Sequence, residues 1–249
     1  MRRSDLQADA LSYMYAHEFV EQLIDEDQLY DPLAHSIEFP TKAPLSDKII
    51  DRNEVAEKVV FCALADLHAQ KRLIFTWQPI ERLLGSHRLC RLAQRLGYAK
   101  GRLLVQRDGS FPRSPLNTAI AELFDSLLVP GSDFISEPRL PLRRLLTLLF
   151  RNRPGERDPY HEVLQWVGEE LIEEGYYTDS TDVLAGATQF REAHPDLAEM
   201  RAAAPHVALL KERLARFERR EPEIYGALKA TVAQTIKELS ILNQRRVTL

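Results

Sequence analysis

The chain is poor in glycine and cysteine for its length. Of its 249 residues, 10 are glycine and 2 are cysteine. Low glycine, together with abundant Leu, Ala, Glu and Arg, favours helix over strand. Neither Cys62 nor Cys90 belongs to a CxxC pair. We therefore expect reduced thiols packed on apolar helix faces, as is usual in a cytosolic protein.

The sequence also lacks a long apolar run. The longest candidate, Leu140 to Phe150, is interrupted by Arg143 and Arg144, and a bilayer-spanning helix needs about 20 mostly apolar residues. Charged residues break the segment from Leu6 to Val20, which argues against a secretory signal. The expected location is the cytoplasm, so any association with a membrane would be peripheral.

Charge of one sign does not dominate the chain. Its 33 Lys and Arg and 37 Asp and Glu give a net charge of −4, so bulk charge does not indicate a nucleic-acid partner. The distribution is uneven, however, because residues 80–153 carry 13 basic and 6 acidic side chains. Most of this excess lies between Arg82 and Arg107.

Apolar residues recur mainly with helical spacing. The pattern predicts helices over Leu6–Leu29, from Asp51 to Gln70, over Pro79–Leu96, Pro115–Leu128, Pro141–Phe150 and Tyr160–Glu174, and two or three helices in Pro195–Leu242 with a break at Glu221–Pro222. Short strands are predicted over Leu73–Trp77 and Leu103–Gln106, and the proline-rich stretch Asp31–Leu45 reads as an irregular connector. The sequence therefore predicts a mostly α fold, a single helical domain with a few short strands. It divides into an N-terminal helix and linker (1–50), a core (51–180) and C-terminal helices (181–249).

Catalytic signatures are missing. The sequence has no GxGxxG, phosphate-binding P-loop or GxSxG motif. The segment His161–Gln165 resembles the zinc motif HExxH, but Gln165 replaces the second histidine ligand, so we expect His161 to be a surface residue. The acidic residues Glu169, Glu170, Glu173 and Glu174 are interpreted as an exposed helix face. We predict no catalytic residue, no metal and no cofactor, and expect the protein to act by binding, with an enzyme left open.

The segment from Ile80 to Leu96 carries the clearest functional pattern. Arg88, Arg91 and Arg95 follow the spacing i, i+3, i+7, and leucines occupy the other side. Such a basic amphipathic helix can lie on an anionic membrane, can contact a phosphate backbone, or can be an ordinary packed helix with solvated arginines. The candidate lipid-binding residues are Arg82, Arg88, Arg91, Arg95, Lys100 and Arg102.

Two helix-to-strand joints keep a winged-helix DNA-binding protein among the alternatives. One follows Ala63–Leu67, and the other follows Glu170–Gly175. The helix before the second joint has five acidic residues and no Lys or Arg. Because it would repel phosphates, nucleic acid is the less favoured partner.

The order of four segments resembles the Golgi phosphoprotein three family of peripheral membrane proteins. The segments are Glu54–Phe75, with Ala63-Leu64-Ala65-Asp66-Leu67 before Lys71-Arg72-Leu73-Ile74; Arg102–Leu123, with Pro115-Leu116-Asn117; Pro141–Phe150; and Val163–Tyr177. The resemblance implies a mainly helical fold that binds phosphatidylinositol 4-phosphate or another anionic headgroup and acts as a membrane-recruited adaptor. The family's headgroup pocket uses a Trp and three Arg, and the corresponding positions here are Asp51, Val60, His161 and Leu164.

A protein adaptor that binds no lipid is the other alternative. In that case the helices of Pro195–Leu242 would pack against a partner through Leu209, Leu210, Leu214 and Phe217. The same residues equally fit burial within the fold. The sequence leaves the partner and the oligomeric state open.

Overall fold

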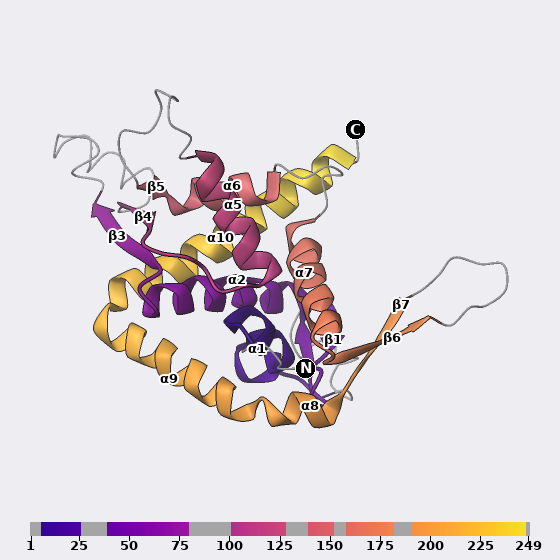
Figure 1. Cartoon of the computed structure of the whole chain (residues 1–249). Helices are drawn as coiled ribbons and strands as arrows, with labels where there is room; N and C mark the ends of the chain where they lie inside the picture. The colour runs from indigo at the N-terminus through magenta and orange to yellow at the C-terminus, as the bar shows by residue number, and fades with distance from the viewer. Residues whose placement is uncertain are drawn as a thin grey trace. The chain divides into compact units, whose positions relative to one another are not determined.

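The computed structural model describes residues 6–25, 39–79, 101–127, 139–151, 158–181 and 191–247, and within them the fold is mostly helical, as the sequence predicts (Figure 1). The chain divides into two compact units. The first comprises residues 1–63, 113–116 and 160–212, and the second comprises residues 64–112, 117–159 and 213–249. The domain boundaries predicted from the sequence stay a prediction.

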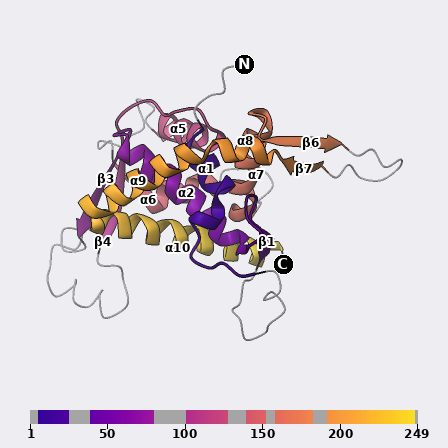
Figure 2. The same ribbon diagram turned by 90° about the horizontal axis from the view of Figure 1, so that it is seen from below.

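The first unit gathers short helices and two hairpins. It holds α1 (Ala8–Met14), the 3₁₀ turn η1 (Ala16–Glu18), β1 (Pro40–Lys42), β2 (Ile49–Asp51), α7 (Pro159–Glu173), β6 (Tyr177–Thr181), β7 (Arg191–Pro195) and α8 (Leu197–Ala202). The strands pair antiparallel within each hairpin, β1 with β2 and β6 with β7. Both views show β6 and β7 side by side (Figure 2). Leu11, Met14 and Val163 are among the side chains that fill the core of this unit.

The second unit is built around a three-stranded antiparallel sheet in the order β3-β4-β5. The strands are β3 (Leu73–Pro79), β4 (Gly101–Arg107) and β5 (Leu140–Pro141), and α6 (Leu142–Arg151) and α10 (Pro222–Val247) pack against the sheet. Most of α5 (Pro115–Leu127) also belongs to this unit. Val105, Leu145 and Ile236 are buried.

Two long helices have residues in both units. α2 (Arg52–Ala69) belongs to the first unit as far as Ala63, and α9 (Ala204–Arg220) belongs to it as far as Glu212. α2 matches the helix that the sequence predicts from Asp51 to Gln70, and it buries Val59, Ala63 and Leu67 among others. The predicted break at Glu221–Pro222 is confirmed, because α9 ends at Arg220 and Pro222 opens α10, a position where the missing N–H of proline costs nothing.

Three predictions about local structure are wrong. The first helix ends at Met14 rather than Leu29, and Ile24 instead exchanges backbone hydrogen bonds with Ile49, at 2.9 and 3.1 Å. The stretch Asp31–Leu45, read as irregular, contains β1. Pro79, expected to open a helix, ends β3 opposite Gly101; the remainder of that helix lies outside the described residues.

Two side-chain interpretations have opposite outcomes. His161 is exposed at the start of α7, as expected. Glu170 is buried, with 8% of its surface exposed, so the acidic cluster of α7 is not uniformly solvated.

Cys62 is a buried thiol on α2, and Cys90 lies outside the described residues.

Candidate functional site

Most of the lipid-binding residues predicted from the sequence lie outside the described residues. These are Arg82, Arg88, Arg91, Arg95 and Lys100. Arg102 is described, and it is exposed on β4, where its Nε donates a hydrogen bond to Gln78 Oε1 at 2.7 Å. Gln78 pairs with Arg102 in the β3–β4 register, close to the end of the hairpin from which residues 80–100 continue.

The four positions that the resemblance assigns to a headgroup pocket have other surroundings in the structure. Asp51 accepts a hydrogen bond from the backbone N–H of Asn53 at 2.8 Å. Val60 is fully buried, Leu164 is half-buried and His161 is exposed. These four side chains therefore do not form a cationic pocket.

A cavity in the second unit brings cations together instead. It has a volume of about 510 Å³ and lies among the C-terminal end of α2, the start of β3 and the last turns of α9. We call it the basic cleft, and it is lined by His68, Ala69, Lys71, Leu73, Ile74, Phe75, Asp108, Arg213, Arg216, Phe217, Arg220 and Glu221.

Three arginines of α9 face this cleft. Arg213, Arg216 and Arg220 follow the spacing i, i+3, i+7, which places them on one side of the helix. Arg213 Nη1 lies 2.9 Å from Asp66 Oδ1, and Gln70 Nε2 donates to Asp66 Oδ2 at 2.6 Å. Burial raises the pKa of Asp66, and the Arg213 guanidinium and the Gln70 amide partly oppose this shift. Arg213 is therefore held in place by a buried carboxyl.

His68 and two phenylalanines form the floor of the cleft. The His68 ring centroid lies 5.3 Å from that of Phe75 and 4.7 Å from that of Phe217. Since a carbonyl can only accept, His68 Nδ1–H donates to Leu73 O at 3.0 Å. His68 Nε2 then faces Glu221 Oε1 at 3.4 Å. The two phenylalanine rings make the floor apolar, and the hydrogen bond from His68 to Leu73 O fixes the His68 ring against them.

Lys71 adds a fourth cation to the lining of the cleft. Lys71 has a φ of 57° in the turn that follows α2, and its N–H donates to His68 O at 2.9 Å. Lys71 and Arg220 are exposed, and neither has an ion-pair partner among the residues that the structure describes. The lining thus holds Lys71 and three arginines against Asp108 and Glu221. An anion with several oxygens would find donors here.

No residue of the basic cleft is among the candidate lipid-binding residues predicted from the sequence. The spacing of Arg213, Arg216 and Arg220 is the one noted for Arg88, Arg91 and Arg95, so the signal was present. The apolar residues of Pro195–Leu242 also fit a helical pattern, and they predict packing rather than a cationic site. Lys71 joins these arginines only through tertiary packing, which the sequence does not reveal.

The apolar residues proposed for a partner are mostly buried. Leu210, Leu214 and Phe217 lie inside the fold, whereas 54% of the surface of Leu209 is exposed. For three of the four residues, burial within the fold is therefore the correct interpretation.

No family model, curated protein or solved structure matches this chain. Over the described ranges, no helix is both long and apolar enough to span a membrane. In the same ranges, no group of three His, Cys, Asp or Glu side chains is placed to hold a metal ion.

Proposed function

We propose that this protein binds anionic phospholipid headgroups of the phosphoinositide type, that it does so at a membrane surface through the basic cleft, and that it acts there as an adaptor. The observation that carries the proposal is the convergence of Lys71, Arg213, Arg216 and Arg220 on a cavity of about 510 Å³. Small-molecule sites have volumes of about 300–1,000 Å³, so a phosphorylated headgroup has room.

The chemistry of the lining supports a phosphate ligand. Guanidinium groups donate two parallel hydrogen bonds to phosphate oxygens. Lys71 and Arg220 have no ion-pair partner among the described residues, so no existing ion pair has to break before they bind. Arg213 is positioned by Asp66 at 2.9 Å, which lowers the entropy lost on binding.

An apolar residue beside the cations favours a lipid over a free phosphate compound. Ile74 lines the cleft, and 36% of its surface is exposed. A large aliphatic side chain next to a headgroup site can contact the membrane interface while the cations bind phosphate. A free sugar phosphate would gain little from that contact.

The basic segment predicted from the sequence is a separate hypothesis. Arg102 lies near the end of the hairpin where Pro79 pairs with Gly101, and the cleft lies at the other end, where Leu73 pairs with Arg107. Seven paired residues separate these ends, about 20 Å of extended strand. One headgroup therefore cannot contact both, and variants can test them independently.

The test is co-sedimentation with vesicles of phosphatidylcholine alone, with added phosphatidylserine, and with added phosphatidylinositol 4-phosphate. Each cation near an anionic surface contributes about 1 kcal/mol, so we expect the triple variant Lys71→Gln, Arg216→Gln, Arg220→Gln to lose roughly a hundredfold in affinity. The matched control Arg144→Gln, Arg219→Gln, Lys237→Gln removes the same charge from exposed residues of the second unit that do not line the cleft. It should bind as the parent chain does.

Other results would contradict the proposal. Full binding by the cleft variant would exclude the cleft. Loss of binding only in Arg88→Gln, Arg91→Gln, Arg95→Gln would move the site to the segment 80–102. If no vesicle sediments the protein at either low or moderate salt, the protein adaptor becomes the better hypothesis. A DNA affinity that falls steeply with salt in a parallel assay would favour the winged-helix alternative.

A further inference from the structure

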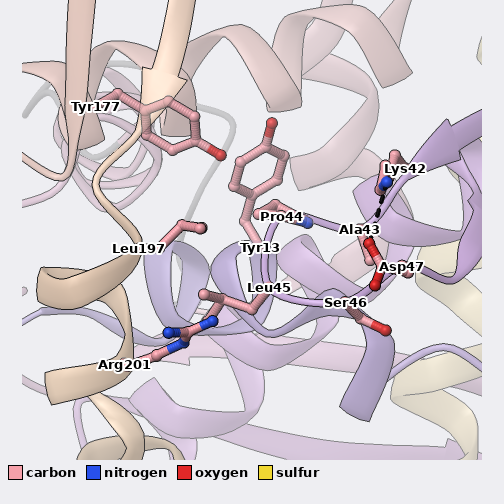
Figure 3. A pocket seen from close by; sticks show the side chains of 10 residues that line it. All are labelled: Tyr13, Lys42, Ala43, Pro44, Leu45, Ser46, Asp47, Tyr177, Leu197 and Arg201. Atoms are coloured by element: carbon pink, nitrogen blue, oxygen red, sulfur yellow. Dashed lines mark ion pairs between the residues drawn. The ribbon is translucent and has the colours of Figure 1, made fainter.

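A second cavity lies in the first unit and shares no lining residue with the cleft. Its volume is about 580 Å³, and it is lined by Tyr13 of α1, the loop 42–47 between β1 and β2, Tyr177 at the start of β6, and Leu197 and Arg201 of α8. Figure 3 shows the side chains of Leu197 and Arg201 extending from α8 toward this loop. We call it the tyrosine cavity.

The loop that forms one wall is held by its own hydrogen bonds. The N–H of Ala43 donates to Lys48 O at 3.0 Å, and the N–H of Ser46 donates to Ala43 O at 3.2 Å. Lys42 and Asp47 form an ion pair at 3.1 Å, drawn as a dashed line in Figure 3. The wall is therefore formed before any ligand arrives.

Two tyrosines, Tyr13 and Tyr177, line the cavity. Burial raises the pKa of both, so both hydroxyls keep their protons at neutral pH.

Two guanidinium groups lie around Tyr13. Arg201 lines the tyrosine cavity, is exposed, and has no ion-pair partner in the described ranges. Arg52 lines a smaller cavity of about 80 Å³ that shares Tyr13, Lys42 and Pro44 with the larger one. The Nε of Arg52 is buried and finds no hydrogen-bond partner among the described residues. A buried donor without an acceptor is costly, and an acceptor on a ligand would remove that cost.

We infer that the tyrosine cavity binds a small organic anion, a carboxylate or phosphate monoester attached to a ring or short hydrocarbon body. The acidic group would accept from Tyr13 and pair with Arg201. The body would lie against the Tyr177 ring and the apolar side chains of Leu45 and Leu197 that also line the cavity. This site goes beyond the membrane function proposed above, because it uses no residue of the basic cleft.

The test follows the tyrosine ring signals of the full chain, labelled at tyrosine, by nuclear magnetic resonance. The probes are phenyl phosphate, benzoate and inorganic phosphate, and Tyr13→Phe and Tyr177→Phe assign the two signals. We expect phenyl phosphate and benzoate to shift both signals saturably at millimolar concentrations. A charged hydrogen bond contributes about 1.5–3 kcal/mol, so Arg201→Gln should weaken binding at least about tenfold.

Two control variants test whether binding depends on this cavity rather than on cations elsewhere in the chain. Arg219→Gln removes an exposed arginine that lines neither cavity and should leave the titration unchanged. The triple cleft variant should also leave it unchanged. Absence of saturable shifts with both organic probes, or undiminished binding in Arg201→Gln, would overturn the inference. Equal affinity for inorganic phosphate would overturn the assignment to an organic anion, and none of these results would affect vesicle binding.

Discussion

At the residue scale, the least expected feature is a pair of acidic side chains in the core of the first unit. Asp9 is fully buried and accepts hydrogen bonds from Ser114 Oγ at 2.6 Å and from the N–H of Ala10 at 3.1 Å. Burial and the charge of Asp9 raise the pKa of Glu170 to about 9. Glu170 therefore keeps its proton at neutral pH.

This proton makes stability depend on pH. The folded pKa of Glu170 is raised above the unfolded value of 4.5, so the folded state binds a proton that the unfolded state has released. The free energy of unfolding should then fall as pH rises between about 5 and 9. Gln is neutral and similar in shape, so Glu170→Gln should flatten this dependence and raise stability at about pH 8 by about 1–3 kcal/mol. Urea unfolding at several pH values measures it.

The neighbouring Glu169 supplies the control. It is exposed on the same helix, so Glu169→Gln should keep the pH dependence of the parent chain. An equally steep dependence in Glu170→Gln would show that another group is responsible.

The burial of Glu170 could not be predicted from its neighbours. Glu169, Glu170, Glu173 and Glu174 form one acidic run, and only packing in the first unit separates the buried Glu170 from the exposed Glu169 and Glu173. His161, at the start of the same helix, was predicted correctly because a polar residue in a first turn is usually solvated. A local sequence pattern predicts exposure correctly where only solvent surrounds the side chain. It fails where an element distant in the sequence, such as α1, contacts the side chain.

At the scale of elements, the β3–β4 hairpin depends on Gly101. A Cβ at this position would lie 2.6 Å from Gln78 O and 2.6 Å from the Trp77 ring. Because the carbonyl belongs to the backbone of the paired strand, the hairpin itself would have to move. We expect Gly101→Ala to destabilise the fold by about 1–3 kcal/mol, the usual cost of overpacking, measured as a lower urea midpoint.

Gly109 provides the matched comparison in the turn after β4. An added Cβ there meets nothing within 4 Å, so Gly109→Ala should change stability by less than about 1 kcal/mol. Similar losses in both variants would mean that the close approach at Gly101 is not what limits the hairpin.

The elements that sequence patterns predicted well are those with local causes. α2 has a continuous buried stripe, β3 and β4 have apolar β-formers, and Pro222 marks the start of α10. A strand after Gly175 was expected, and β6 begins there at Tyr177, but β1, β2 and β7 were missed, since these strands are only three to five residues long. Their stability comes from pairing, which no single strand encodes. The basic cleft was missed for a related reason, because Lys71 and Arg220 meet only after folding.

At the scale of the whole molecule, the net charge of the chain and the charge of its proposed binding site have opposite signs. The chain carries −4 and has a pI of about 6.0, yet its proposed binding site is cationic. The Debye length is about 30 Å at 0.01 M salt and about 10 Å at 0.1 M. An anionic vesicle therefore senses the whole chain at low salt and mainly the cleft at moderate salt.

Vesicle affinity should accordingly pass through a maximum. At neutral pH we expect binding to strengthen as salt rises from about 0.01 to about 0.1 M and to weaken beyond it. Near pH 5 the net charge becomes positive, and affinity should fall steadily with salt. Co-sedimentation across a salt series at both pH values measures this. A steady fall at neutral pH would show that net repulsion is not felt at the membrane.

Each of the two compact units contains one of the chain's tryptophans. Trp166 is buried on α7 in the first unit, and Trp77 lies half-buried on β3 in the second. The chain has only these two. Each unit thus contains its own intrinsic fluorophore, and replacing one indole leaves an emission spectrum that follows the other unit alone.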